Sequence, residues 1–152
     1  MFYTFQESRK SDPARFGSGS ETIDECSRCL VLVDLCKALS QEVYADCYLQ
    51  QHLMAIQGFP TTTNLPSITS KVYCQMLKDE IQRLLKHISP KFISNGLCAL
   101  VLAYDDFGKS LRECDCISNL TDSMDIFGTH VETWLESASD ELISQCRYVS
   151  AC

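Results

Sequence analysis

The chain lacks the excess of basic residues that nucleic-acid binding requires. Its 152 residues carry 13 Lys and Arg against 20 Asp and Glu, so the formal net charge is −7. Proteins bind nucleic acids by neutralising phosphates with basic side chains, and no basic stripe runs along this sequence. We therefore expect no nucleic-acid partner.

Long apolar runs are missing as well. The longest one, from Leu97 to Tyr104, is too short to cross a bilayer. Residues 1–10 lack the apolar centre of a signal peptide, and residues 145–152 form no hydrophobic tail. We expect a cytoplasmic protein with no integral membrane anchor of its own.

The signatures of an enzyme are absent too. The chain has no glycine-rich phosphate loop. Cys98 lies in an apolar segment, where a thiol stays neutral and inert. Cys26 and Cys29 have the spacing of a redox pair, but the βαβ pattern that accompanies such pairs is not present. We predict that the protein is not an enzyme.

Cysteine, in contrast, is abundant, with 10 residues, and its use has three interpretations. A secreted disulfide framework needs an export signal, which is not seen. A zinc site would combine Cys26 and Cys29 with Cys114 and Cys116, but the second pair has a one-residue spacer that is unusual for zinc. Most of the other cysteines lie beside apolar residues, where a free thiol behaves as a small hydrophobe. We favour buried thiols and predict no metal and no cofactor.

Alternating strand patterns are not evident, whereas helical periodicity is. We expect a flexible N-terminal segment over residues 1–20, with a connector at 17–20, and a single domain over residues 21–152. Thr22 to Glu25 resembles a capping box that opens the first helix. One helix over residues 22–57 would be long for a globular domain, so two helices are expected there.

The remaining helices follow from loops and apolar stripes. Residues 58–67 read as a loop, and Ser89-Pro90 ends the helix over residues 71–88 or starts the next one. The segment from Phe92 to Tyr104 has no polar face after Gly96, so we expect it to be buried on all sides at the centre of a bundle. The pattern predicts an all-α fold of six or seven helices, which include residues 71–88, 92–104, a stripe over 120–135, and 140–149.

Two motifs resemble those of the Bcl-2 family of apoptosis regulators. Asn95-Gly96, followed by the apolar run to Tyr104 or to Phe107-Gly108, is similar to the family's first homology motif. His130-Val-Glu-Thr-Trp134-Leu135 is similar to the first half of its second motif. The resemblance covers roughly residues 70 to 142 and is most like a compact viral member. It implies a Bcl-2-like helical bundle with a buried central hydrophobic helix.

The sequence departs from the family pattern at three places. Leu97 stands where the family has the arginine that pairs with an aspartate of the ligand, and Lys91 and Arg112 are the nearest substitutes in sequence. Residues 136–140 do not match the second half of the second motif. No clear third homology (BH3) signature is present. Because a killer protein needs a BH3 helix of its own, the resemblance favours an anti-apoptotic member.

The resemblance implies an anti-apoptotic protein that sequesters the BH3 helices of pro-apoptotic proteins in a hydrophobic groove. Loss of the arginine implies weaker binding or a restricted partner range. Any association with mitochondria would come through these partners, and a homodimer is possible because an exposed apolar groove favours self-association. The groove residues implied are Leu53, Ile56, Tyr73, Leu77, Ile81, Leu84, Leu85, Asn95, Gly96, Leu97, Leu100 and Tyr104.

Two other functions stay open at this point. The degenerate arginine position also fits a Bcl-2-like protein with a closed groove that modulates host innate immune signalling. The apolar helix and the His–Trp pair also fit an unrelated helical adaptor or a zinc-stabilised domain. Binding of BH3 peptides separates the first function from the second, and metal analysis of the purified protein tests the third.

Overall fold

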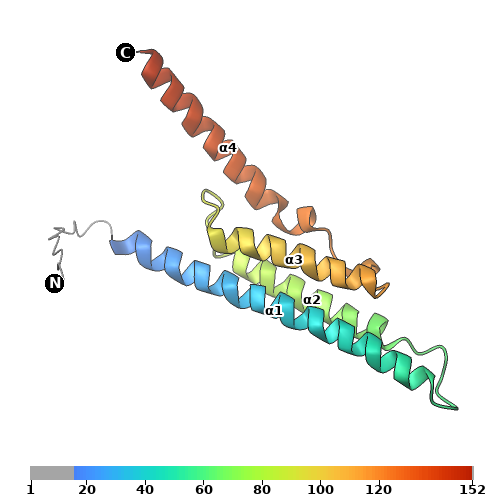
Figure 1. Ribbon diagram of the computed structural model, residues 1–152. Coiled ribbons are helices and arrows are strands. Elements are labelled where there is room, and N and C mark those ends of the chain that lie inside the picture. Colours follow the sequence, from blue (N-terminus) through green and yellow to red (C-terminus); the bar gives the residue numbers. More distant parts are fainter. Residues whose placement is uncertain (1–15, 152) are drawn as a thin grey trace, which may run out of the picture.

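The computed structural model describes residues 16–151, with the side chains of residues 24–151 except that of residue 118. Four α-helices make up most of this part of the chain (Figure 1). They are α1 (Phe16–Met54), α2 (Leu65–Leu85), α3 (Asn95–Glu113) and α4 (Ser123–Ser150), with a short 3-10 turn, η2 (Ile117–Asn119), before α4. Residues 16–151 contain no strand, which confirms the prediction of an all-α protein.

Helices α1, α2 and α3 lie side by side as a bundle (Figure 1). Side-chain hydrogen bonds fix their directions. Asp46, late in α1, accepts hydrogen bonds from Thr69 at 2.6 Å and from Tyr73 at 3.0 Å, both early in α2. Tyr44 of α1 donates to Glu113 at the end of α3. Helix α2 is therefore antiparallel to α1, and α3 is parallel to it.

A single apolar core fills the space between these three helices. Helix α1 contributes one continuous buried stripe at helical spacing, and α2 and α3 face it with their own stripes. Phe107, Leu77, Ile81, Leu100 and Leu111 are fully buried at its centre. The α1 stripe consists of Cys29, Leu32, Val33, Cys36, Leu39 and Val43.

Each of the later helices begins at a side chain that caps it. Asn64 accepts a hydrogen bond from the Ser67 backbone N–H at 3.0 Å, and Ser94 accepts one from Leu97 at 3.1 Å. Asp122 does the same for Met124 at 2.8 Å. Such caps satisfy backbone donors that have no partner within the first turn, so they fix where α2, α3 and α4 start.

The prediction of two helices over residues 22–57 is wrong, because α1 is one helix of 39 residues. It also includes residues 17–20, which were expected to be a connector, and Thr22 to Glu25, which were expected to be a cap. The expected flexible segment otherwise falls on residues 1–15, outside the described residues. Packing of the buried stripe from Cys29 to Val43 holds the middle of α1 as one helix, and the helix continues past the stripe at both ends.

The predicted number of helices is wrong as well. The expected break at residues 137–139 does not occur, so the stripe over 120–135 and the helix over 140–149 merge into α4. The expected helices over 71–88 and 92–104 exist with different ends, as α2 and α3. The described residues therefore hold four α-helices instead of six or seven.

Helix α3 is not buried on all sides as predicted. Gly96, Leu97, Leu100, Ala103, Tyr104 and Phe107 face the core, whereas Cys98 is exposed and Leu102 is 67% exposed. Over the apolar run, the outer face of α3 is apolar but uncovered, and its charged residues begin only at Asp105.

Helices α1 and α3 approach each other closely at Gly96. A Cβ atom placed there would lie 3.0 Å from Cys29 Cβ, 3.1 Å from Cys26 Sγ and 3.2 Å from Cys26 Cα. The last of these atoms belongs to the backbone of α1, which cannot move aside as a side chain can. A side chain at this position would therefore push the two helices apart by a few tenths of an ångström.

The first turns of α4 pack on the bundle, and the rest of α4 extends away from it (Figure 1). Phe127 makes an edge-to-face contact with Tyr104, with 5.8 Å between ring centroids. The Tyr104 hydroxyl donates to the Thr121 carbonyl at 2.7 Å, and Asn119 donates to Ser70 Oγ at 2.9 Å. Beyond this base every residue from Ser139 to Ala151 is exposed.

Within the described residues, no helix combines the length and the apolar character that crossing a membrane demands.

We predict that Gly96→Val destabilises the fold by about 1–3 kcal/mol, the usual cost of overpacking a well-packed interface. Gly128→Ala is the matched control, because a Cβ there meets only Met124 Cε at 3.7 Å. That change removes a glycine from a helix interior and should stabilise by about 0.5–1 kcal/mol. Urea unfolding followed by circular dichroism measures both; equal midpoints for Gly96→Val and the unchanged protein would contradict the close approach.

Candidate binding cleft between α1 and α2

Most of the groove residues implied by the family resemblance lie in the core. Leu77, Ile81, Leu84, Leu85, Leu97, Leu100 and Tyr104 all belong to the buried cluster between α1, α2 and α3. Gly96 is buried against α1. These residues are brought together in the core, and among them Leu84 also lines the open cleft between α1 and α2.

The other implied groove residues do not join this cluster. Leu53 is half-buried near the end of α1, and Ile56 is exposed in the loop after it. Gly96 packs against Cys26, and the 27 residues of helix from there to Leu53 correspond to about 40 Å at 1.5 Å per residue. Asn95 is exposed, and Tyr73 is engaged by Asp46. A single ligand site therefore cannot include both Gly96 and Leu53.

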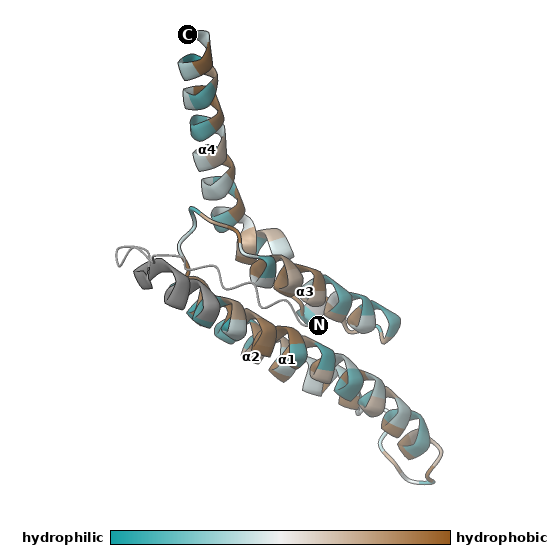
Figure 2. Cartoon of the chain, turned by 60° about the vertical axis from the view of Figure 1, so that its left-hand side comes forward, coloured by the Kyte–Doolittle hydropathy of each residue, from teal (hydrophilic) through white to brown (hydrophobic). Residues whose placement is uncertain are grey.

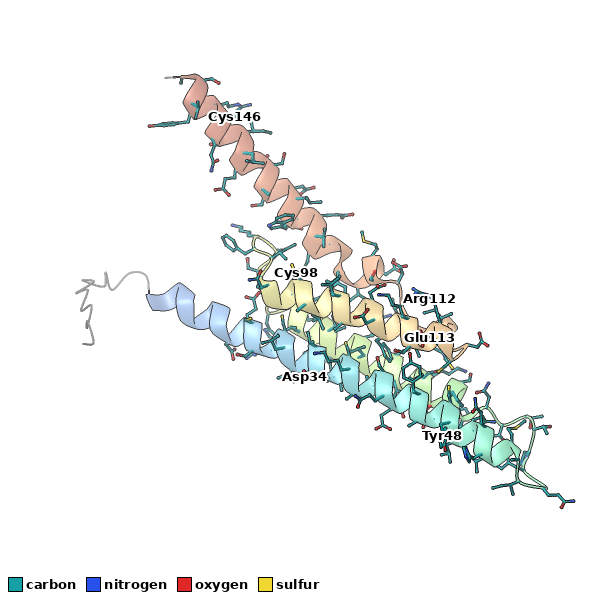
Figure 3. The ribbon with its side chains drawn as sticks, viewed as in Figure 1. Asp34, Tyr48, Cys98, Arg112, Glu113 and Cys146 are labelled. Carbon is teal, nitrogen blue, oxygen red and sulfur yellow. The ribbon has the colours of Figure 1, made fainter. Side chains whose placement is uncertain are left out.

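Leu97, which stands where the family resemblance expects an arginine, does not line an open site either. Leu97 is buried in the core, so a ligand cannot reach it. Lys91 is exposed in the loop before α3, and Arg112 is exposed near the opposite end of α3 (Figure 3). Neither side chain lines the cleft described below.

His130 and Trp134, which carry the resemblance to the second motif, lie on α4. Nε2 of His130 donates to the Ile88 carbonyl at 3.4 Å and so ties α4 to the end of α2. Trp134 is half-buried one turn later, where α4 leaves the bundle.

An open cleft lies instead between the first half of α1 and the last turns of α2. It encloses about 310 Å³. Val31 and Leu32 of α1 and Leu84 of α2 form an apolar floor, and Val31 is 67% exposed. Polar residues from both helices surround this floor, namely Arg28, Glu80, Arg83 and His87.

The two arginines of the cleft are held only by weak surface ion pairs. Arg28 pairs with Asp24 at 3.0 Å, and Arg83 pairs with Glu80 at 2.6 Å. Each pair lies within one helix and is largely exposed. Such a pair contributes only a few tenths of a kcal/mol to stability. A carboxylate on a ligand can therefore replace the internal acid. An arginine is well suited to this because its guanidinium binds a carboxylate through two hydrogen bonds.

A second hollow of about 330 Å³ continues the cleft toward the base of α4. It shares Arg28, Leu84 and His87 with the cleft and adds Ile88 and Glu25. Burial raises the pKa of the Glu25 carboxyl, and the nearby His130 opposes this rise. The two hollows form one continuous surface, apolar at its centre and charged along its edges.

Sequence reasoning identified Leu84 in this cleft and missed Arg28, Val31, Leu32, Glu80, Arg83 and His87. Val31 and Arg83 lie beside the buried stripes of α1 and α2. A helical projection of each segment shows that each residue borders its buried stripe, but it does not show that the two residues face each other. That information requires the antiparallel register of α1 and α2.

The buried-thiol interpretation is confirmed for four of the nine cysteines described, and the prediction that Cys98 is shielded in an apolar helix is wrong, because Cys98 is exposed. Cys29, Cys36, Cys74 and Cys116 are buried, and burial raises the pKa of Cys36 to about 12 and that of Cys29 to about 11. Burial, and a hydrogen bond with Cys114, raise the pKa of Cys47 to about 12. Among the described residues no group of three or more His, Cys, Asp or Glu side chains is arranged to hold a metal ion.

We predict that thiol reactivity divides the cysteines by position. Cys98 and Cys146, which are exposed (Figure 3), should be alkylated within minutes at pH 8. Cys29 and Cys36 should stay unmodified there, because the thiolate is the reactive form and their pKa values lie near 11 and 12. Mass spectrometry of peptides after iodoacetamide treatment measures this, with a urea-unfolded sample as control. Rapid labelling of Cys36 in the folded protein would contradict the packing of α1.

Comparison of the chain with protein-family models, with curated proteins and with solved structures gives no match. The function is therefore inferred from the geometry of the cleft and from the residues themselves.

Proposed function

We propose that the protein is a helix-binding interaction module, and that the cleft between α1 and α2 holds an amphipathic helix of a partner protein. The observation that carries this proposal is the exposed apolar floor at Val31, with Arg28 and Arg83 on its edges. An amphipathic helix binds in a groove through apolar side chains at i, i+3 or i+4, and i+7. A carboxylate on that helix would meet the arginines.

The shape and charge of the cleft fit this partner better than a small substrate. The cleft is open, and the adjoining hollow extends it along the α1–α2 boundary. Enzyme sites are usually enclosed and hold groups with pKa values matched to catalysis. Here the polar groups are paired arginines and carboxylates near the surface. They suit recognition of a charged side chain.

Among helices of this chemistry, the BH3 helices of pro-apoptotic proteins are the partners that the motif resemblance indicates. A BH3 helix carries apolar anchors and an aspartate. In this proposal the protein is anti-apoptotic and sequesters such helices, and its Bcl-2-like character belongs to the same proposal. Arg28 and Arg83 would take the place of the family arginine that is absent at Leu97.

We predict that Val31→Glu weakens binding of a BH3 peptide at least about tenfold, because it places a charge on the apolar floor. Leu102→Glu is the matched control: it makes the same kind of change on α3, at a side chain that is also 67% exposed. Isothermal titration calorimetry against a panel of BH3 peptides measures both variants. Binding that responds to Leu102→Glu and not to Val31→Glu would place the ligand elsewhere.

The role of the arginines is tested with a matched peptide. Arg83→Ala should weaken binding by about ten- to a hundredfold, the effect of losing a hydrogen bond to a charged group. The same variant should have little effect on a peptide whose aspartate is replaced by asparagine, since the contact is then already lost. Equal losses with both peptides would show that Arg83 does not bind this aspartate. No measurable binding of any BH3 peptide would reject the proposed partner class.

A further inference from the structure

Two contacts fix the register in which α1 and α3 face each other. Near the start of α3, a Cβ atom placed at Gly96 would lie 3.0 Å from Cys29 Cβ of α1. Near the end of α3, Glu113 accepts a hydrogen bond from the Tyr44 hydroxyl of α1. The helices run parallel and share one core between these contacts. Residues that face each other can therefore be counted along both helices.

This register places one cysteine of α1 opposite one of α3. Cys47 follows Cys29 by 18 residues, and Cys114, which caps α3, follows Gly96 by 18 residues. Eighteen residues make about five full turns at 3.6 residues per turn, so the later pair lies on the same sides of the two helices as the earlier pair. A hydrogen bond between Cys47 and Cys114 agrees with this placement.

The spacing of the two helices suits a bond between these thiols. A disulfide joins side chains whose Cβ atoms lie about 3.5–4.5 Å apart. The equivalent position at Gly96 would hold its Cβ 3.0 Å from that of Cys29, so the helices are close enough. Cys47 and Cys114 are also half-buried, whereas Cys29 is fully buried. A small reagent in solution can therefore reach the pair.

The end of α3 holds Cys114 in place. The Cys116 backbone N–H donates to the Leu111 carbonyl at 2.7 Å, and the Asp115 N–H donates to the Arg112 carbonyl at 3.1 Å. Asp115 has a positive φ of 57°, as this hydrogen-bonded helix ending requires. The backbone around Cys114 is thus fixed beside α1 before any bond forms.

We propose that Cys47 and Cys114 are a redox-sensitive pair, which a low-molecular-weight disulfide such as oxidised glutathione converts into a disulfide bond between α1 and α3. The bond would join two helices that are already packed together, so it would lock the bundle without rearranging it. The proposal does not depend on the α1–α2 cleft, because neither cysteine lines it.

The two thiols have different roles in this exchange. Burial first, and the hydrogen bond with Cys114, raise the pKa of Cys47 to about 12, so the shared proton stays on Cys47 and Cys114 attacks as the thiolate. Cys114 Sγ bonds to one sulfur of oxidised glutathione, and one reduced glutathione leaves. Cys47 then loses its proton and attacks Cys114 Sγ, which releases the second glutathione. The two electrons and two protons lost by the protein leave with these two molecules.

The first test identifies the bond in the full chain. After incubation with oxidised glutathione at pH 8 and blocking of free thiols with N-ethylmaleimide, mass spectrometry of unreduced peptides should show Cys47 linked to the peptide of Cys114. This peptide also contains Cys116, so Cys114→Ala should abolish the link and Cys116→Ala should keep it. The opposite pattern, or Cys47 recovered only in its blocked form, would overturn the proposal.

The second test measures the effect of the bond on stability. The linked chain should melt about 5–15 °C higher than the reduced chain, because the bond restricts the unfolded state. Dithiothreitol should reverse the rise. Cys47→Ala should remove it, and Cys98→Ala, at an exposed thiol of α3, should keep it. A linked chain that melts no higher than the reduced chain would show that the bond does not fit the α1–α3 interface.

The third test concerns the order of attack. With Cys47→Ala, one glutathione should remain attached to Cys114, because no second thiol is there to displace it. With Cys114→Ala, Cys47 should stay a free thiol, because burial, the first cause of its raised pKa, is still present. Mass spectrometry of both variants after the same incubation measures this. Glutathione attached to Cys47 and absent from Cys114 would overturn the proposed roles.

Discussion

The close packing of α3 against α1 at Gly96 is the contact on which the arrangement of the other elements depends. Only the hydrogen atom of Gly96 separates the α3 backbone from Cys26 and Cys29, so α3 lies directly on α1 along a shared core. Helix α2 packs on the remaining side of this core, and Thr69 and Tyr73 in its early part donate hydrogen bonds to Asp46 of α1. The base of α4 rests on Tyr104 of α3. A side chain at Gly96 would therefore disturb the α1–α3 interface first and, through α3, the base of α4.

The sequence was sufficient to predict helices and their apolar faces, but not their ends. Stripes such as Leu77, Ile81 and Leu84 are buried as periodicity indicates. The boundaries differ because local start and stop signals are weak. Helix α1 continues through Thr22 to Glu25, where a cap was expected, and α4 continues through residues 137–139. Local signals of this kind are worth about 1 kcal/mol, which is too little to end a helix by itself.

The candidate site was harder to predict, for a different reason. Periodicity shows that a leucine faces something apolar, but it does not distinguish a core from a groove. Leu97 and Leu100 lie under α1, so the face that a ligand would need is already occupied. The open apolar residue is Val31, which lies beside the buried stripe of α1. Its importance depends on Arg83 of α2 lying across from it, and only the register between helices provides that information.

The contact between His130 and the Ile88 carbonyl links the cleft to α4. Ile88 lines the hollow that continues the α1–α2 cleft, so this hollow reaches the part of α4 that packs on the bundle. The outer part of α4, beyond residue 135, contributes no residue to either hollow, and its hydrophobic residues lie along one edge of the helix (Figure 2). A partner helix in the cleft would therefore leave that edge of α4 free, because the two surfaces share no residue.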